Sequence, residues 1–225
     1  MQLTKIRIKN YRLLIDAELE VDPKMTLIVG RNNTAKTSCF SCIGTVLDGE
    51  SMTFDDYPLL RREDFYTKFA LFMEKKLSYE DLCKRIEVIS IEFLVDYSLD
   101  DPDDNLGALS PFIIDIDMDT TTAQIRAEYR LKTDEKTLWT LLESSYYKDG
   151  VFSTSEEANK VLADNFGKLF GLTIYAINPN NPDDKQVKSQ KELHDLFPFH
   201  AIPAERVLGE DETHNSSLGL LISGF

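Results

Sequence analysis

The sequence is poor in cysteine and histidine, with three of each. Cys39-Phe-Ser-Cys42 forms a C-x-x-C, but no second pair and no nearby His completes a zinc set. On a helix, Cys39 would join Ile43 on the buried face, so core packing is the favoured interpretation and redox or metal chemistry is the alternative. We therefore predict free, reduced thiols in a cytoplasmic protein.

Long hydrophobic runs are also missing. No stretch approaches a membrane span, and the N-terminal residues lack the apolar region of a signal peptide, so we expect no membrane partner. Positive charge is scarce as well, because 25 Lys and Arg face 39 Asp and Glu for a net charge of −14. That balance is far from a basic nucleic-acid binder. Residues 1–40 differ, with seven basic and four acidic residues and a net charge of +3. A DNA contact would therefore need this local patch, a region outside the chain or a partner.

What is present is a core-forming chain with one informative stretch. The 225 residues are 42% hydrophobic, enough for one large domain or two small ones. Met25–Val29 is a continuous apolar run that predicts a strand buried on both faces. Gly30-Arg-Asn-Asn-Thr-Ala-Lys36-Thr37 follows at once, and apolar residues then recur at helical spacing until Gly49, which is placed to end the helix. A strand, a loop and a helix in this order are typical of a phosphate-binding loop, because backbone N–H groups and the helix N-terminus attract an anion.

The loop residues have definite expected roles. Lys36, the candidate catalytic residue, would reach the β- and γ-phosphates of ATP, and the Thr37 hydroxyl would ligate Mg²⁺. The other candidate nucleotide ligands in the loop are Gly30, Arg31, Asn32, Asn33, Thr34, Ala35 and Ser38. Ala35 stands where G-x-x-x-x-G-K-[ST] has its second Gly, and its Cβ could crowd the phosphate or strain a backbone angle that Gly takes freely. The alternative is an ordinary turn between a strand and a helix.

Two half-buried strands are expected ahead of the loop. Ile6 and Ile8 alternate with basic residues, a second alternation of apolar and acidic residues covers 16–22, and the two join near Asn10-Tyr-Arg12. With Ile6-Arg-Ile-Lys-Asn10-Tyr-Arg12 and the loop 27–38, residues 1–48 resemble the N-terminal lobe of ABC-type ATPases of the SMC/RecF class. The K-N-Y-R and G-x-N details resemble the overcoming-lysogenization-defect (OLD) family.

This resemblance implies more than the residues alone. It implies an α/β P-loop NTPase of the ABC-ATPase head type, with a mixed sheet, an antiparallel β-rich arm and flanking helices. It implies ATP and Mg²⁺ as cofactors, a role in DNA repair or phage defence, a homo-oligomer formed through the ATPase head, and a DNA or nuclease partner bound through regions outside the chain. It places Arg12 beside the nucleotide and, more weakly, 61–64 over it. Ala204-Glu-Arg206 resembles the I-P-A-E-R turn of OLD-like ATPases, where Arg206 would serve the nucleotide or an interface; a structural ion pair is the alternative.

We expect residues 1–225 to form the first lobe of such a head. The four expected regions are 1–50 (strands, phosphate loop and first helix), 51–86 (helical), 87–132 (antiparallel β arm) and 133–225 (helices and short strands). In the helical region, Phe65, Phe69, Phe72 and Met73 form an apolar stripe that predicts core. In the arm, alternation predicts a strand over 89–97 and a hairpin of 114–118 with 123–131. In the last region, turn residues predict a loop over 178–184, and a helix is expected over 185–197.

Parts that ATP hydrolysis needs are not evident in the sequence. The acidic run 100–104 matches no Ca²⁺ loop, so a solvated loop is favoured over a metal site. Phe112–Asp115 imitates a Walker B strand, but the alternation continues past Asp115 as in an exposed strand. There is no Leu-Ser-Gly-Gly signature and no Toprim cluster. We expect either part of an ATP hydrolase, conceivably an ATP-dependent nuclease, whose remaining parts lie outside the chain, or a degenerate scaffold that binds nucleotide without turnover. A small P-loop kinase fits poorly, because strands precede the loop.

Overall fold

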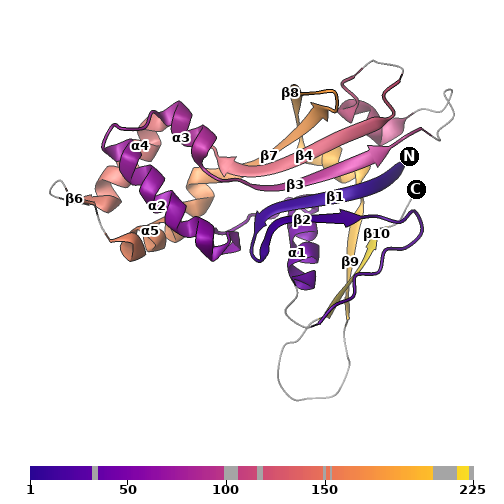
Figure 1. Cartoon of the computed structure of the whole chain (residues 1–225), viewed down its shortest axis with the longest axis horizontal. Coiled ribbons are helices and arrows are strands. Elements are labelled where there is room, and N and C mark those ends of the chain that lie inside the picture. Colours follow the sequence, from indigo (N-terminus) through magenta and orange to yellow (C-terminus); the bar gives the residue numbers. More distant parts are fainter. Residues whose placement is uncertain are drawn as a thin grey trace, which may run out of the picture.

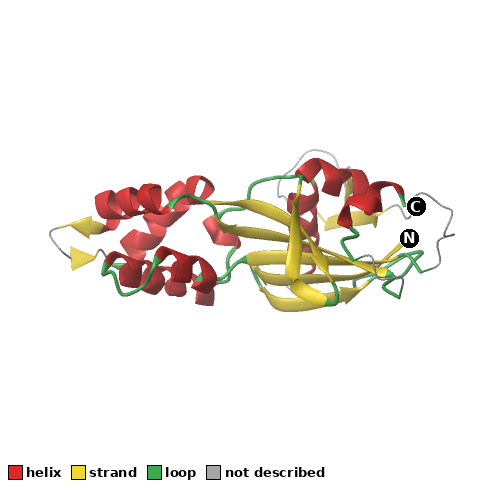
Figure 2. Ribbon diagram, turned by 90° about the horizontal axis from the view of Figure 1, so that it is seen from above, coloured by secondary structure: helices red, strands yellow, loops and turns green. Residues whose placement is uncertain are grey.

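The computed structural model describes residues 1–31, 35–98, 106–115, 119–148, 151–152, 154–204 and 217–222. Figure 1 shows a twisted sheet with a helical lobe projecting from one end and the phosphate-loop helix lying below its strands. Seen from above in Figure 2, the helices that cover the sheet lie on one face, and the opposite face is open. The fold is therefore α/β, with one layer of helices on one sheet and a separate helical end.

The main sheet has six strands in the order β2-β1-β3-β4-β7-β8. Their bounds are β1 (Gln2–Tyr11), β2 (Leu14–Glu20), β3 (Ile89–Asp96), β4 (Thr122–Leu131), β7 (Phe170–Asn178) and β8 (Asn181–Lys188). Every strand pair in the described part of the chain is antiparallel. The two strands predicted before the loop and the strand predicted over 89–97 are confirmed, whereas the mixed sheet that we predicted is not found.

The sheet forms because its strands alternate between an apolar and a polar face. Residues of β3 and β4 are buried at every second position, which places Phe93 opposite Ile125 on the covered face. On the open face, opposite charges pair across strands, as in Arg126 with Glu92 at 2.6 Å. The alternation that was visible in the sequence therefore sets which face meets the helices.

Three short elements cover the apolar face. They are α1 (Lys36–Leu47), α6 (Gln190–Leu196) and the 3-10 helix η2 (Gly107–Phe112). The Gln190 side chain donates hydrogen bonds to the carbonyls of Val46 and Leu47, at 2.9 and 3.0 Å, and so ties α6 to the C-terminal end of α1. Two further strands, β9 (Phe199–Ala204) and β10 (Ser217–Ile222), pair as a ribbon beside α1 (Figure 1). Helix α1 thus lies between the main sheet and this ribbon.

The helical lobe contains most of the remaining chain. Its elements are the 3-10 helix η1 (Phe54–Asp56), α2 (Leu59–Met73), α3 (Tyr79–Arg85), α4 (Glu135–Tyr146), the short strands β5 (Tyr147–Lys148) and β6 (Val151–Phe152), and α5 (Ser155–Leu169). The predicted stripe of Phe65, Phe69, Phe72 and Met73 is confirmed, because all four side chains are buried. One hydrophobic cluster continues from this lobe under the sheet, so the two parts share a core.

Three sequence predictions of local structure were wrong. The hairpin of 114–118 with 123–131 does not form in the described residues, because both edges of β4 are taken by β3 and β7; residues 116–118 lie outside the described part. The loop predicted over 178–184 is largely β8, which pairs along β7. The helix predicted over 185–197 is confirmed only for α6, because residues 185–188 also belong to β8. In both cases backbone pairing to a distant strand decides the structure.

The third error concerns the strand expected before the phosphate loop. Met25–Val29 is extended but belongs to no strand, and the side chains of Met25, Leu27 and Val29 are 77%, 76% and 78% exposed. A strand buried on both faces needs hydrogen-bonding neighbours and covering layers. Within the described part of the chain, no strand of the main sheet pairs with this segment. Its apolar composition alone therefore did not bury it.

Candidate phosphate-binding site

The start of α1 has the geometry of an anion site. The helix begins at Lys36, has no side-chain N-cap and carries no acidic residue in its first turn. The first intrahelical bond joins the Cys39 N–H to the Ala35 carbonyl at 2.9 Å. The N–H groups of Thr37 and Ser38 precede this bond and have no intrahelical acceptor. Unsatisfied N–H groups and the helix dipole together favour a bound anion at this end.

Ala35 adopts the backbone conformation that the missing glycine would take. Its φ is 64° and its ψ is 6°, in the left-handed region. An L-residue with a Cβ is strained there, while Gly is not. The prediction that Ala35 strains the backbone is therefore confirmed, and the loop takes the left-handed turn despite the substitution.

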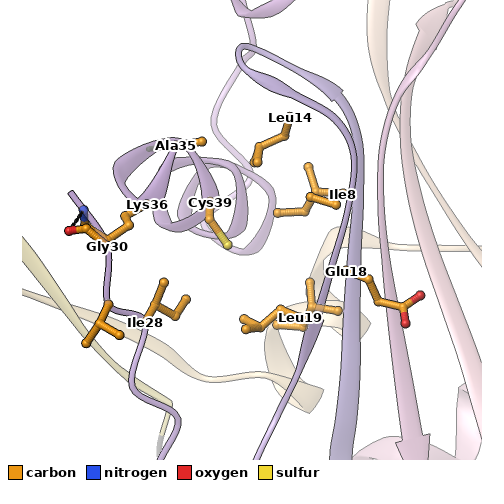
Figure 3. Close-up of a pocket in the computed structure, with 12 residues that line it drawn as sticks. Ile8, Leu14, Glu18, Leu19, Ile28, Gly30, Ala35, Lys36 and Cys39 are labelled. Atoms are coloured by element: carbon orange, nitrogen blue, oxygen red, sulfur yellow. Dashed lines mark hydrogen bonds between the residues drawn. The ribbon is translucent and has the colours of Figure 1, made fainter. Parts of the chain in front are cut away.

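The Lys36 side chain draws the two ends of the loop together. Its Nζ donates to the carbonyl of Gly30 at 2.6 Å and to that of Arg31 at 2.5 Å, the first of which is visible in Figure 3. An ammonium group with three donors can exchange such carbonyls for phosphate oxygens. Asn32, Asn33 and Thr34 lie outside the described residues, so their contacts with a nucleotide stay predictions.

The residues around Lys36 fit a magnesium nucleotide in composition. Thr37 is exposed on the first turn of α1 and Ser38 is buried. Mg²⁺ is commonly held by one or two protein groups together with substrate phosphates and waters, so a single hydroxyl such as that of Thr37 is a sufficient first ligand. Within the described ranges there is no cluster of three metal-ligating side chains. Asp115 follows η2 rather than a strand and accepts a hydrogen bond from the Asn180 amide at 3.0 Å, which does not favour a Walker B role.

The end of β1 brings Arg12 close to α1. The Tyr11 hydroxyl lies 3.0 Å from the Ser41 hydroxyl, one turn beyond the start of the helix. The next residue, Arg12, donates from Nε to the Asp56 carboxylate at 2.9 Å, and its backbone N–H donates to the Asp56 carbonyl at 2.6 Å. Sequence reasoning missed Asp56. The spacing Thr53-x-x-Asp56 could have indicated this residue, because it is the spacing of a capping box, and the two residues form one at η1.

An apolar pocket of about 440 Å³ lies between the β1–β2 hairpin and the loop. Figure 3 shows Ile8, Leu14 and Leu19 on the hairpin side, Ile28 below, and the Cys39 sulfur pointing inward from α1. Gly30, Ala35 and Lys36 also line it, so the pocket adjoins both ends of the phosphate loop. The volume is in the range of small-molecule sites.

Burial controls the chemistry of the groups behind the loop. It raises the pKa of the Tyr11 hydroxyl to about 12, against a smaller lowering by the hydrogen bond to Ser41. Burial also raises the pKa of the Cys42 thiol, which is fully buried. None of the three cysteines forms a disulfide. A thiol held neutral is a poor nucleophile and metal ligand. The interpretation of the C-x-x-C as core is thus favoured, although Cys39 also faces the pocket.

The remaining candidates are either separate or outside the described part. Arg61, on α2, approaches the carboxylates of Asp64 and Glu87 at 3.8 and 3.6 Å. Arg206 and the acidic run 100–104 lie outside the described residues. No helix in the described part is long and apolar enough to cross a membrane.

Comparison with known proteins agrees with the loop geometry. The family described as "AAA ATPase domain" matches residues 1–216, nearly the whole chain. A search of the curated proteins finds no match. An ATPase domain implies ATP binding, typically with Mg²⁺. On the extent of this match, the chain belongs to the AAA ATPase domain family.

Proposed function

We propose that this chain is the ATP-binding lobe of an OLD/RecF-like ATPase of DNA repair or phage defence. Mg-ATP binds through residues 30–38, with Lys36 on the β- and γ-phosphates, Thr37 on Mg²⁺ and Arg12 beside the nucleotide. The observation that carries the proposal is the start of α1, where a left-handed Ala35, open N–H groups and the Lys36 ammonium converge. The K-N-Y-R and G-x-N residues support the narrower family.

Calorimetric titration of Mg-ATP into the chain tests nucleotide binding. The matched pair of variants is Lys36→Ala and Lys24→Ala, because Lys24 is an exposed lysine on the same basic N-terminal part. We expect the parent and Lys24→Ala to bind alike and Lys36→Ala to lose at least about tenfold in affinity, the value of one or two charge-assisted hydrogen bonds. Equal weakening by both variants would show that only net charge matters and would contradict the phosphate-loop assignment.

A second candidate is a regulatory or scaffold module that binds ATP without hydrolysing it. It is favoured by the strained Ala35 and by the lack of an acidic metal cluster among the described residues. Phosphate release measured with the same variants distinguishes the two. Release that depends on Lys36 supports the ATPase, and Lys36-dependent binding without release supports the scaffold. Light scattering with and without Mg-ATP tests the proposed homo-oligomer against the 25.7 kDa protomer.

A further inference from the structure

Asp56 stands out among the charged residues of the described chain because it is buried, at 7% exposure. One carboxylate oxygen accepts the Arg12 Nε–H at 2.9 Å, and the other accepts the Thr53 N–H at 2.9 Å and its hydroxyl at 3.1 Å. A buried carboxylate with all its contacts made on fixed groups is held in one place. Asp56 is therefore a rigid anchor for whatever it binds.

The Arg12 guanidinium, which binds one oxygen of Asp56, reaches solvent. Its side chain is 43% exposed, and only its Nε engages the carboxylate. Neither terminal nitrogen has a hydrogen-bond acceptor among the described residues. A guanidinium anchored at Nε still presents a fork of N–H donors at its other end, which is the geometry that binds phosphate oxygens.

Three successive residues, 10–12, where β1 ends, contact three separate segments of the chain. The Asn10 amide donates to the Val88 carbonyl at 3.0 Å, the Tyr11 hydroxyl meets Ser41 on α1, and Arg12 binds Asp56 on η1. Asn10 and Arg12 both have left-handed backbones, with φ of 56° and 49°. Strained non-glycine residues persist where surrounding contacts hold them, and they gather at functional sites.

The hairpin end that carries Arg12 packs against the N-terminal half of α1, the helix that follows the phosphate loop. Ser41 is five residues after Lys36, about 7.5 Å along the helix axis, and the Arg12 guanidinium carbon lies 5.0 Å over the Tyr11 ring that contacts Ser41. Leu14, two residues after Arg12, shares the pocket with Ala35 and Lys36 (Figure 3).

We propose that Asp56 is a positioning residue that aims the Arg12 guanidinium at the nucleotide phosphates. This inference rests on the proposed function and adds to it a residue outside the loop. Asp56 fixes the Arg12 Nε, so the terminal N–H groups of Arg12 are already ordered before the nucleotide binds. This preorganisation raises the affinity for the nucleotide. A phosphate-contacting arginine without this anchor would lose part of that gain as side-chain entropy.

A double-mutant cycle tests this role. Mg-ATP affinity is measured for the parent, Arg12→Ala, Asp56→Asn and the double variant. Asp56→Asn keeps an oxygen acceptor for Thr53. Loss of the negative charge of Asp56 affects the phosphates whether residue 12 is Arg or Ala, so this effect cancels in the cycle. We expect Arg12→Ala to weaken binding about tenfold in the parent but less than about threefold in the Asp56→Asn background. An equal or larger loss in that background would overturn the inference.

Two further variants separate positioning from general structure. Asp55→Asn breaks the neighbouring Arg62–Asp55 pair, with its 2.7 Å contact, and should leave ATP affinity unchanged. Arg12→Lys keeps the charge but not the fork, so it should bind ATP about as weakly as Arg12→Ala; parent-like binding would overturn the inference even if Asp56→Asn failed to fold. Lys36-dependent binding without the Arg12–Asp56 coupling would refute the positioning role alone. A parent that shows no Lys36-dependent binding would refute the proposed function as well.

Discussion

Replacing Ala35 by glycine should stabilise this protein, although glycine normally destabilises the interior of a helix. Ala35 has φ of 64°, and the left-handed conformation costs an L-residue about 1–2 kcal/mol that Gly does not incur. Glycine loses about 0.5–1 kcal/mol more conformational entropy on folding. The net gain is about 0.5–1 kcal/mol, which corresponds to a rise of about 1–4 °C in the thermal midpoint of a domain of this size.

Thermal unfolding of Ala35→Gly beside Ala70→Gly measures this effect. Ala70 lies within α2, where the same substitution should cost about 1 kcal/mol. The two variants should therefore shift the midpoint in opposite directions. Calorimetry should show Ala35→Gly binding Mg-ATP at least as tightly as the parent, because the turn that holds the phosphate is no longer strained. A midpoint lowered in both variants would refute the assigned strain at Ala35.

Further predictions concern the core, a helix cap and the buried thiol. Phe166→Ala should cost about 3–5 kcal/mol in urea unfolding, since the Phe166 ring stacks on Phe170 at 4.5 Å in the core; a loss below about 1 kcal/mol would contradict this packing. The Ser189 backbone N–H, at 2.7 Å, lowers the pKa of Glu192, so the cap contributes stability above the ordinary Glu pKa and loses it as pH falls through the lowered value. The midpoint difference between the parent and Glu192→Ala should accordingly shrink from about pH 7 to about pH 3, and a constant difference would argue against the carboxylate cap. Cys42 should resist alkylation in the native protein and react after unfolding, as mass spectrometry would show.

Local patterns in the sequence were enough to predict much of the fold. The alternation around Ile6 and Ile8 and the alternation over 89–97 predicted β1 and β3. The helical spacing after Lys36 predicted α1, and its end before Gly49 agrees with the left-handed φ of 69° at that glycine. These signals are reliable because the period of the apolar residues and the backbone angle at the glycine depend on a few neighbouring residues. The strain at Ala35 followed from the same local reasoning.

Local patterns failed where the partner of a segment was distant in the sequence. The polar stretch 181–188 carries loop residues, yet it becomes β8 because β7 offers it a free edge. The apolar run Met25–Val29 carries a strand pattern, yet it remains unpaired because no described strand lies along it. Hydrogen bonding between strands is set by the neighbour and not by the segment itself.

For the candidate site, the sequence by itself was enough to predict the phosphate loop and the roles proposed for Lys36 and Thr37, because that chemistry depends on contiguous residues. Only the tertiary structure revealed the Asp56 carboxylate beside Arg12, 44 residues away in the chain. No spacing rule connects a hairpin end to a buried acid on another element. Their contact depends on how β1, α1 and η1 pack together, and packing is decided by the whole core.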